Sequence, residues 1–592
     1  MRVSTDRPGV SGRARKPRDP AERRIRSRIR LLRGWILLAA LGLIARLAYL
    51  QIWDSPHLSA VARQQRTRIL NLASLRKDIL DRNGAQLAVS EEAWSVYVQP
   101  QDFKGDPAQA AARLAPLLGV DETKLEQALA GHHWAWLARE EDRATAKQVR
   151  ALKIPGIGLL EETKRVYPKD ETAGTLIGFV GVDNRGLAGI EHDFNALIMG
   201  PPRQLAIQVD AKGNEILRDA HENPLDAVET SSGAVQLTID QAIQHVAESR
   251  LAEAIQTFDA AHGVVIVMNP WNGDVLAFAT LPTYDPNHPD LASPSVITNW
   301  GISKVFEPGS VMKPFTIAAA LQVGTITPQT VFTCPPRLQI GDRSIGDHDP
   351  GPGIRHLIPA QILKVSSNVG ASQIGRSMPD SVQRAFFIKF GFGRTTQSGL
   401  GGESRGILPP LPWRPIRHAT ISYGQGISVT ALQLATAECA LANGGYAVRP
   451  RLIERILDAS GKVVQTFPPA PMRRVVSTRV TQELLPMLEG VTDPGGTGTA
   501  ARVPGYHVAG KTGTAQKAWP DGRGYSPDVV STFLGFVPAE KPRIVILATL
   551  DAPQKAHFAS ETTAPIFRDV AAATLRILGS EPSPTLEASP SV

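Results

Sequence analysis

Two residues in one short segment have the types and the spacing needed for acyl transfer. Ser310 stands three positions before Lys313, and residues at i and i+3 share one face of a helix, about 5–6 Å apart between Cβ atoms. A serine hydroxyl needs a base to become a nucleophile, and a lysine can serve when burial lowers its pKa. The spacing therefore predicts Ser310 as nucleophile and Lys313 as its base, although an ordinary helix start has the same pattern.

A second motif further along the chain could complete a proton path. Ser366 and Asn368 lie in the segment QILKVSSNVGASQIG. The Ser366 hydroxyl could relay a proton between Lys313 and a leaving amine, and the Asn368 amide could hydrogen-bond a substrate amide. A polar helix cap is the alternative interpretation of this segment.

A third motif, residues 511–514, lies on the predicted strand HVAGKTGTA. Thr512 and Thr514 share one face of a strand, so their hydroxyls could hold a carboxylate, with Lys511 adding positive potential. Gly513 would let a substrate backbone come close. The backbone N–H of Thr514, with that of the nucleophile, would stabilise an oxyanion. An edge strand that ends in a flexible turn is the alternative.

These motifs fall on the elements of one predicted α/β block, residues 236–578. Thr238 or Asp240 could cap a helix whose apolar residues repeat in steps of three and four. We expect an antiparallel sheet flanked by helices in three layers, with a helix-rich region at about 300–480 inserted as a subdomain. The apolar helix positions are Ile243, Ala247, Leu251, Ile255 and Phe258; the predicted strands lie in 263–269, 274–280, 507–515, 531–538 and 542–550, and a helix over 563–578 closes the block.

The preceding block, residues 54–230, shows no spacing of a nucleophile and a base. It contains a strong turn signal at Asn83-Gly84 and a helical pattern from Pro107 to Leu118. We expect an elongated α+β pedestal that holds the catalytic block away from the membrane. The last residues, 579–592, are rich in Ser and Pro and should be disordered.

Charge and hydropathy place the chain at a membrane rather than on nucleic acid. The net charge of +8 is concentrated in residues 1–33, which carry twelve Lys and Arg against three acidic residues, so the rest has no basic excess. Residues 34–53 form a mostly apolar run of 20 residues, which is about the length of a membrane-spanning helix. The basic side should remain in the cytoplasm, which places the rest of the chain on the other side of the membrane.

Three features near this run have more than one interpretation. A cleaved signal peptide is the rival of the anchor, because Ala60-Val61-Ala62 resembles a cleavage site, but the basic region is too long and the site too distant. Arg46 could reach the outer interface or contact another membrane protein. The basic tail, which should be disordered, could bind anionic lipid or a cytoplasmic partner, or only set the topology.

The sequence predicts neither a metal site nor an organic cofactor. Its two cysteines, Cys334 and Cys439, are too few for a disulfide framework or a cysteine zinc site. Asp347-His348-Asp349 could suggest metal ligands, but this tripeptide lies in a Gly/Pro loop without a third spaced ligand set.

Ser-x-x-Lys, Ser-x-Asn and Lys-Thr-Gly in this order are the signature set of penicillin-binding proteins and serine β-lactamases. Over nearly all of residues 30–575, the sequence resembles a class B penicillin-binding protein, a monofunctional peptidoglycan D,D-transpeptidase. Asn368 and the GGTGT stretch (495–499) resemble the division-specific (septal) branch, because the elongation-specific branch usually has aspartate in place of Asn368. The other matching segments are Arg76 with Asp81-Arg82-Asn83-Gly84, Arg165-Val166-Tyr167-Pro168, Gly186–Glu191, LTID (237–240), Tyr284–Asn287, FEPGSVMKPF, SYGQGISVT and KTGTA.

The resemblance implies two acyl transfers without a metal or an organic cofactor. Ser310 would attack the penultimate D-Ala carbonyl of a stem pentapeptide with Lys313 as base, and Ser366 would help to protonate the departing D-Ala. The amides of Ser310 and Thr514 would stabilise the oxyanion, and the third motif would bind the terminal carboxylate. An amine from a neighbouring stem peptide would then attack the acyl-enzyme, and β-lactams would acylate Ser310. Expected partners are a septal glycan polymerase of the shape-elongation-division-sporulation type and other division proteins.

Four rival functions share parts of this pattern. A serine β-lactamase has the three motifs but is usually a small free domain, and no Glu-x-x-Leu-Asn deacylation motif is present. A bifunctional synthase would need a glycosyltransferase domain ahead of the catalytic block. An elongation-specific transpeptidase and a protein that is mainly a division scaffold remain open alternatives. Two departures from the family, Lys77 for the usual glycine and Asn299-Trp300-Gly301 for the usual Asn-Arg-Ala, concern loop shape and not a catalytic position.

Overall fold

The computed structural model describes residues 20–72, 75–200, 203–209, 215–217, 232–519 and 524–583. The chain forms two compact units: the first consists of residues 1–72 and 203–226, and the second of residues 73–202 and 227–592. The first unit contains the apolar helix, and the second contains all three motifs singled out in the sequence.

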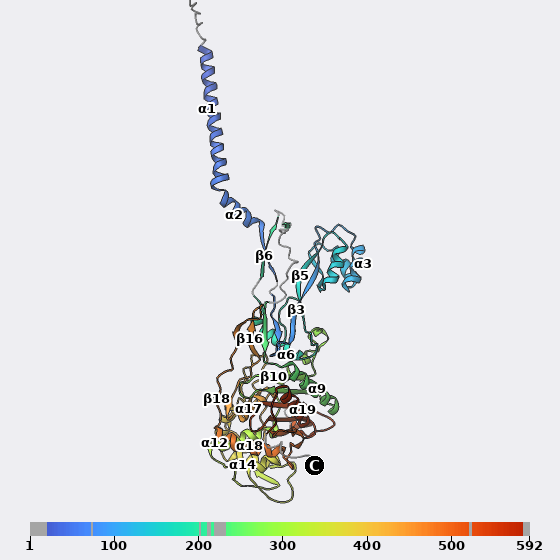
Figure 1. The fold of residues 1–592 in the computed structure, drawn as a ribbon, viewed down its shortest axis with the longest axis vertical. Helices are drawn as coiled ribbons and strands as arrows, with labels where there is room; N and C mark the ends of the chain where they lie inside the picture. The colour runs from blue at the N-terminus through green and yellow to red at the C-terminus, as the bar shows by residue number, and fades with distance from the viewer. Residues whose placement is uncertain are drawn as a thin grey trace, which may run out of the picture. The chain divides into compact units, whose positions relative to one another are not determined.

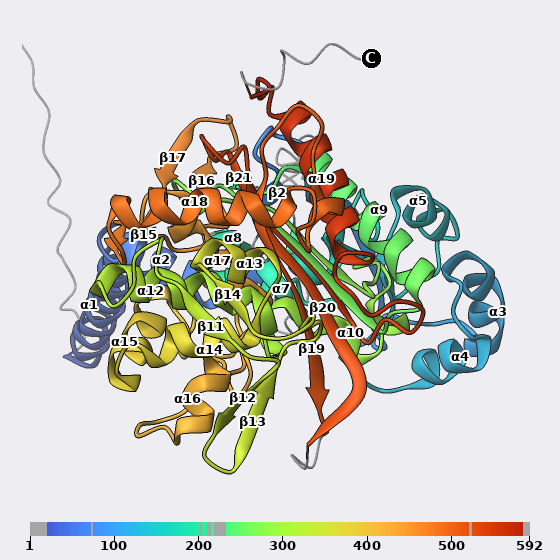
Figure 2. The same cartoon turned by 90° about the horizontal axis from the view of Figure 1, so that it is seen from below.

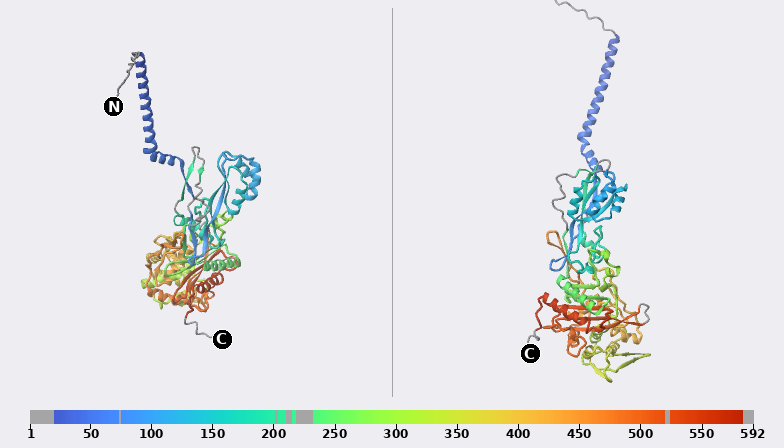
Figure 3. Two further views of the ribbon diagram at one scale, coloured as in Figure 1. Left: turned by 45° about the horizontal axis from the view of Figure 1, so that its top comes forward. Right: turned by 90° about the vertical axis from the view of Figure 1, so that its right-hand side faces the viewer.

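The first unit combines a long helix with a small sheet (Figures 1 and 3). Helix α1 (Pro20–Ala48) continues through a π-helical turn (Tyr49–Trp53), and α2 (Ser55–Arg66) follows at an angle. Residues 28–53 have a mean hydropathy of 1.8 and are not buried by protein, so this helix is long and apolar enough to cross a membrane. Strands β1 (Thr67–Leu72), β6 (Arg203–Val209) and β7 (Glu215–Leu217) form an antiparallel sheet in the order β1-β6-β7.

The helix begins earlier than the apolar run predicts. The sequence predicts a span over 34–53 and a disordered tail before it, but residues 20–33 are helical. Arginine and leucine are good helix formers, so the basic segment can extend a helix that the apolar residues establish. The predicted disordered end, 579–592, begins too early, because the Ser583 N–H donates to the Gly505 carbonyl at 2.8 Å and the Tyr506 hydroxyl donates to the Ser580 carbonyl at 2.6 Å. Residues 1–19 and 584–592, for which disorder is also predicted, lie outside the described residues.

In the second unit, residues 75–200 contribute to a sheet in the order β17-β16-β8-β2-β3-β4, with β5 paired to β3. Helices α3, α4 and α5 cover one face of β3 and β4, where Val96 and Val98 pack against Leu114 and Leu125. Helix α3 coincides with the predicted helix: Asp106 caps its start, and Gly119 ends it in a left-handed conformation. The elements are β2 (Asp78–Leu80), β3 (Gln86–Val98), α3 (Pro107–Leu118), α4 (Glu122–Ala130), β4 (Ala135–Glu141), α5 (Arg143–Ala151), β5 (Ile157–Val166), α6 (Gly174–Ile177), α7 (Gly189–Asp193) and α8 (Asn195–Ile198).

This sheet continues across the predicted boundary between residues 230 and 236. Strand β8 (Ala234–Leu237) pairs in parallel with β2 on one side and antiparallel with β16 (Ile453–Leu457) on the other. Strand β17 (Val463–Thr466) completes the edge. Residues from both predicted blocks therefore share one set of backbone hydrogen bonds.

Three motifs of the amino-terminal block meet in one buried ion cluster. Arg165 Nε donates to Glu191 Oε1 at 2.7 Å, and Arg76 pairs with the other oxygen of the same carboxylate. The three side chains are almost completely buried, and buried charges persist only when they are paired. A second anchor is Asp81, whose carboxylate accepts the backbone N–H of Gln241 at the start of α9. These motifs therefore hold the structure together and contribute no nucleophile.

The carboxyl-terminal block is built on a five-stranded antiparallel sheet in the order β10-β9-β21-β20-β19. Alternate residues of β9 face opposite layers: Val265 and Val267 pack with helices α9 and α19, whereas Val264 and Ile266 pack in the larger core with α12 and α17. Figure 2 shows α9 and α19 on one side of the sheet and α12 and α17 on the other, as the three-layer prediction requires. The elements are α9 (Gln241–Phe258), β9 (His262–Met268), β10 (Val275–Leu281), β19 (Ala509–Ala518), β20 (Tyr525–Val537), β21 (Ile544–Asp551) and α19 (Thr563–Ile577).

Two details of these elements differ from the prediction. Asp240 alone caps α9, because the Thr238 hydroxyl instead donates to the carbonyls of Val275 and Arg451. Strand β20 begins six residues before the predicted strand, at Tyr525. Tyr525, Val529 and Val530 of this extension pair with β19, and Val530 also pairs with Asp551 of β21.

The remaining helices form a subdomain between β10 and β19, as predicted. Two of these helices carry motif residues at their first turn, because α12 begins at Lys313 and α14 begins at Asn368. The elements are η2 (Pro289–Leu291), α10 (Pro294–Ile297), α11 (Trp300–Ser303), η3 (Gly309–Met312), α12 (Lys313–Val323), β11 (Phe332–Cys334), β12 (Arg337–Ile340), β13 (Arg343–Gly346), β14 (Arg355–Leu357), α13 (Pro359–Lys364), α14 (Asn368–Arg376), α15 (Asp380–Phe390), α16 (Pro415–Ile421), α17 (Ala431–Ala442), β15 (Tyr446–Ala447), β18 (Arg473–Arg474), α18 (Thr478–Thr492) and η4 (Thr499–Ala501).

Candidate active site

Ser310 lies on a single 3₁₀ turn, η3, that leads directly into α12. Gly309 precedes it in a left-handed conformation, with φ of +59°, and its backbone N–H donates to the carbonyl of Gly424 at 3.1 Å. A Cβ at Gly424 would stand only 2.2 Å from the Gly309 carbonyl oxygen, so glycine is required there. The tight packing fixes the turn and leaves the Ser310 side chain half-buried.

The three polar residues of the first two motifs form one hydrogen-bonded path. Lys313 Nζ donates to the Ser366 hydroxyl at 3.1 Å and to the Ser366 carbonyl at 2.5 Å. Ser366 Oγ in turn donates to Ser310 Oγ at 2.9 Å. Among the hydrogen bonds of the described residues, none joins Lys313 directly to Ser310. Ser366 therefore links the two residues that the i, i+3 spacing pairs.

Lys313 is completely buried. Burial lowers its pKa well below the usual range, and the positive charge of Lys511 lowers it further, while the Asp347 carboxylate opposes the shift. A lysine with a lowered pKa has a larger neutral fraction at neutral pH. It can therefore accept a proton, as a base next to a serine must.

Ser366 is held in an unusual backbone conformation. Its φ of +57° is rare for a residue with a side chain, and it lies between the end of α13 and the cap of α14. Ser367 provides that cap, because its hydroxyl accepts the backbone N–H of Gly370 at 3.0 Å. Ser367 is therefore the helix cap, whereas Ser366 belongs to the hydrogen-bonded path of the site.

Asp347 positions the second motif, and the sequence did not indicate this role. Its carboxylate accepts the Ser367 hydroxyl at 2.7 Å and the backbone N–H groups of Asn368 and Val369 at 2.6 and 2.9 Å. Arg355 pairs with the same carboxylate at 2.6 Å. A carboxylate at the first turn of α14 also complements the helix dipole. No group of three metal-ligand side chains occurs in the described part of the chain, and Asp347 is fully engaged.

The Asn368 side chain lies beside this loop. Its Nδ2 donates to the Gly346 carbonyl at 3.4 Å, a long hydrogen bond that a better acceptor can replace. The Asn368 side chain is half-buried on the first turn of α14, and Asn368 follows Ser366 by two residues in the sequence. This is the location that a substrate-binding amide would need.

The third motif lies on β19, the edge strand of the five-stranded sheet. Lys511 is buried, and burial lowers its pKa to about 7. Its Nζ donates to Thr512 Oγ1 at 3.1 Å and to Thr497 Oγ1 at 3.4 Å, and the two threonine hydroxyls are 2.8 Å apart. Thr514, on the same strand, is exposed. The motif presents a cation and several hydroxyls along one edge, as carboxylate binding requires.

Gly513 has a packing role in addition to the predicted one of making room for a substrate backbone. A Cβ at this position would lie 2.9 Å from the Pro308 carbonyl oxygen and 3.0 Å from Val311 Cγ1. Both residues belong to the nucleophile turn. Gly513 therefore allows β19 to pack against η3, which brings the first and third motifs together.

Two further contributors lie outside the predicted residues. Thr497, in the GGTGT stretch, joins the Lys511 cluster described above. Glu307 accepts the Tyr525 hydroxyl at 3.0 Å and the backbone N–H of Gly426 at 2.8 Å, and burial raises its pKa. Glu307 thus connects the segment before the nucleophile to β20 and to the SYGQGISVT loop, and no local pattern indicates such distant partners.

The model of the penicillin binding protein transpeptidase domain matches residues 263–572, and that of the penicillin-binding protein dimerisation domain matches residues 72–227. The peptidoglycan D,D-transpeptidase FtsI of Escherichia coli (strain K12) is 32% identical over 568 residues, covering 94% of this chain and 92% of that protein. The probable peptidoglycan D,D-transpeptidase PenA of Neisseria meningitidis is 32% identical over 558 residues, covering 92% of each.

The chain belongs to the class B penicillin-binding proteins, in their division-specific branch.

Solved structures agree with this family and its transpeptidase fold. Penicillin binding protein 3 from Mycobacterium tuberculosis, complexed with aztreonam, has a TM-score of 0.68 at 27% identity, covering 88% of this chain and 99% of that one. A peptidoglycan synthetase from Bifidobacterium adolescentis has a TM-score of 0.69 at 28% identity, covering 89% and 98%. The predicted fold class of this penicillin-binding protein is therefore confirmed.

Proposed function

We propose that this chain is a peptidoglycan D,D-transpeptidase that cross-links stem peptides in septal cell wall through an acyl-enzyme at Ser310. The observation that carries the proposal is the hydrogen-bonded path from Ser310 through Ser366 to the buried amine of Lys313. The relatives named as peptidoglycan D,D-transpeptidases support the same reaction.

Acylation begins with neutral Lys313. In that state the path runs from the Ser310 O–H to Ser366 Oγ, and from the Ser366 O–H to Lys313 Nζ, so the amine gains the proton as Ser310 Oγ attacks. The attacked atom is the carbonyl carbon of the penultimate D-Ala of a stem pentapeptide. The backbone N–H groups of Ser310 and Thr514 stabilise the resulting oxyanion. Close packing of η3 against β19 at Gly513 supports this joint role.

Collapse of the intermediate breaks the C–N bond to the terminal D-Ala. The departing amine takes its proton from Lys313 through Ser366, which restores the neutral amine. Lys511, Thr512 and Thr514 hold the terminal carboxylate of the donor peptide, and the Asn368 amide hydrogen-bonds a substrate amide. The amine of a neighbouring stem peptide then attacks the acyl carbon, and the same path carries its proton to Lys313. Collapse of this second intermediate breaks the bond to Ser310 Oγ, which regains its proton from Lys313 through Ser366.

β-Lactams react by the first half of this sequence. Their carboxylate occupies the place of the terminal D-Ala carboxylate, and the ring opens onto Ser310. Because the opened ring remains attached to the acyl group, no leaving amine departs and the acyl-enzyme persists. The solved structure of a related penicillin binding protein with aztreonam supports this expectation.

The apolar helix of the first unit supports a membrane location. The helix of residues 28–53 anchors the chain in the inner membrane by a single pass, with the basic amino terminus in the cytoplasm and the transpeptidase block in the periplasm. The Arg46 guanidinium lies 5.4 Å from the centroid of the Tyr49 ring, a cation–π contact with the turn that follows α1. A septal glycan polymerase of the shape-elongation-division-sporulation type and other division proteins are the proposed partners, because cross-linking must accompany glycan synthesis.

The test uses the full-length, detergent-solubilised protein with a fluorescent penicillin. Ser310→Ala should abolish covalent labelling, and Ser366→Ala should slow it by about 100-fold or more, within the range that general acid–base groups contribute. Labelling of Ser310→Ala at the wild-type rate would exclude the proposed nucleophile. Rapid turnover of free penicillin would instead indicate a β-lactamase.

Cell experiments separate the septal role from its alternatives. Depletion should give long filaments with fluorescent penicillin label lost from mid-cell, whereas rounded cells would indicate elongation. Normal growth of cells that carry only the Ser310→Ala protein would show that scaffolding is the main role.

A further inference from the structure

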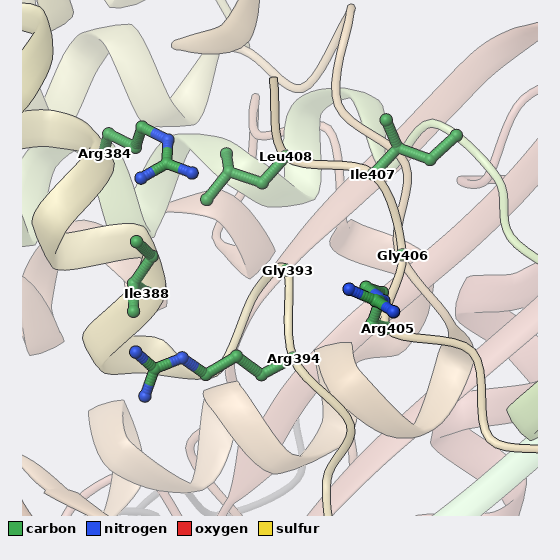
Figure 4. Close-up of a pocket in the computed structure, with 8 residues that line it drawn as sticks. All are labelled: Arg384, Ile388, Gly393, Arg394, Arg405, Gly406, Ile407 and Leu408. Atoms are coloured by element: carbon green, nitrogen blue, oxygen red, sulfur yellow. The ribbon is translucent and has the colours of Figure 1, made fainter. Parts of the chain in front are cut away.

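A cavity of about 440 Å³ lies in the helical subdomain, and none of its lining residues belongs to the three motifs (Figure 4). Helix α15 forms one wall, and the segments 393–394 and 405–408 form the others. Its volume falls within the range of about 300–1,000 Å³ that is usual for ligand sites.

Three arginines line this cavity: Arg384, Arg394 and Arg405. Arg384 Nε donates to the Pro409 carbonyl at 3.0 Å, and Arg394 and Arg405 are exposed. In the part of the chain that the structure describes, none of the three forms an ion pair with a carboxylate. Three guanidinium groups around one concavity produce a positive potential that attracts an anion.

The arrangement of the arginines indicates the kind of anion. In Figure 4, Arg384 and Arg394 lie on one side of the cavity and Arg405 on the other, with the aliphatic side chains of Ile388 and Leu408 between them. A single phosphate is best bound by guanidinium groups that converge on one point. Separate cations around aliphatic side chains suit a peptide that carries several carboxylates and an apolar side chain.

The walls that carry two of the arginines are fixed from behind. Buried Gln433 donates from Nε2 to the Arg394 carbonyl at 2.6 Å and to the Arg405 carbonyl at 2.8 Å. Gly406 has a φ of +68°, and a Cβ there would lie 2.4 Å from the Ser428 carbonyl oxygen. Because these segments are held by buried contacts, a ligand would not have to order them, which favours binding.

From these observations we propose that the cavity binds an acidic peptide segment of a partner protein. The peptide would place an aliphatic side chain against Ile388 and Leu408, and its carboxylates would pair with the arginines around them. This docking site is separate from the nucleophile and from the substrate-binding edge of β19.

The experiment measures fluorescence anisotropy of a labelled Glu-Leu-Glu-Glu peptide with the full-length protein in detergent. The matched Gln-Leu-Gln-Gln peptide should bind far more weakly, and added salt should reduce binding of the acidic peptide because it screens exposed charges. Arg394→Glu and Arg405→Glu should each raise the Kd by about tenfold or more, the equivalent of one lost charge pair. Arg343→Glu is the control, because Arg343 is an exposed arginine of the same block outside the cavity.

Covalent labelling by fluorescent penicillin at the wild-type rate verifies that each variant is folded. The proposal is overturned if the wild-type protein does not bind the acidic peptide, or if it binds the neutral peptide equally well. It is also overturned if both arginine variants bind like the Arg343→Glu control. Competition by inorganic phosphate as strong as that by unlabelled peptide would assign the cavity to phosphate groups instead.

Discussion

The Asp347 carboxylate accepts the backbone N–H of Asn368 at 2.6 Å and thereby fixes the first residue of α14. The same carboxylate holds the Ser367 hydroxyl at 2.7 Å. Ser366, which precedes both, connects the nucleophile to its base. A residue from a Gly/Pro loop therefore determines where the proton path of the active site lies.

Asp347→Asn should slow acylation of Ser310 without abolishing it. The substitution keeps the shape of the side chain but removes its charge, which weakens hydrogen bonds worth about 1.5–3 kcal/mol each to a charged group. We expect the second-order rate constant for fluorescent penicillin to fall by about tenfold or more. Asp349→Asn is the control, because Asp349 lies two residues away in the same loop but is exposed. Equal rates in the two variants would contradict the positioning role.

The acylation rate should pass through a maximum with pH. Burial lowers the pKa of Lys313, so acidification through that pKa protonates the base and the rate falls. The pKa of Lys511 is about 7, so above about pH 7 this lysine loses its charge and binds the β-lactam carboxylate less well. The rate constant should therefore decline above about pH 7 as Lys511 loses its charge, and decline again as the pH falls through the lowered pKa of Lys313, by up to about tenfold per pH unit on each limb. Stopped-flow labelling over a pH series measures it.

Lys511→Arg distinguishes the two limbs of this profile. Arginine remains protonated over the whole accessible range, so the decline on the alkaline side should disappear while the decline on the acidic side remains. An alkaline decline that persists in the variant would assign it to another group.

Gly513→Ala should disturb the nucleophile turn more than the fold. The new Cβ would lie 2.9 Å from the Pro308 carbonyl oxygen and 3.0 Å from Val311 Cγ1, and overpacking of this kind costs about 1–3 kcal/mol. We expect penicillin labelling to slow by about tenfold or more, since η3 and β19 must separate to accommodate the methyl group. Gly490→Ala, in α18 with open space around it, should leave labelling unchanged.

The two helices and the five strands of the main sheet in the catalytic block could be predicted from local sequence. The apolar stripe that begins at Ile243 and the cap at Asp240 indicate α9, and continuous apolar runs indicate the buried strands β9 and β21. Such patterns depend on neighbours within a few residues. The order of the three motifs then indicated the chemistry, because each motif falls on an element that can present it.

Other features depend on partners far away in the sequence and could not be predicted. The roles of Asp347, Thr497 and Glu307 arise from contacts with segments that no periodicity connects to them. The same holds for β8, which pairs with β2 and β16 across the predicted domain boundary. The sequence predicted Ser366 as a possible proton relay. It could not predict that, among the described residues, Lys313 and Ser310 are joined by hydrogen bonds only through Ser366.

The buried cluster of Arg76, Arg165 and Glu191 provides a test of the amino-terminal block. Glu191 is the only carboxylate with a recorded ion pair to either arginine among the described residues. Its side chain is fully buried, so solvent cannot replace it as a partner. Removing one member of a buried ion pair leaves an uncompensated charge and costs about 3–5 kcal/mol.

Glu191→Gln should therefore destabilise the protein strongly. Two buried guanidinium groups would lose their counter-charge, so the midpoint of thermal unfolding should fall by about 5 °C or more. Glu253→Gln is the matched control, because Glu253 pairs with Arg250 on the exposed surface of α9, at 2.7 Å, where such pairs contribute at most about 1 kcal/mol. Scanning calorimetry of the two variants in the same detergent measures the difference. If both variants unfold at the wild-type temperature, the three amino-terminal motifs do not stabilise the fold through this cluster. Because none of these residues touches the acyl-transfer site, penicillin labelling below the unfolding transition should remain unchanged in both.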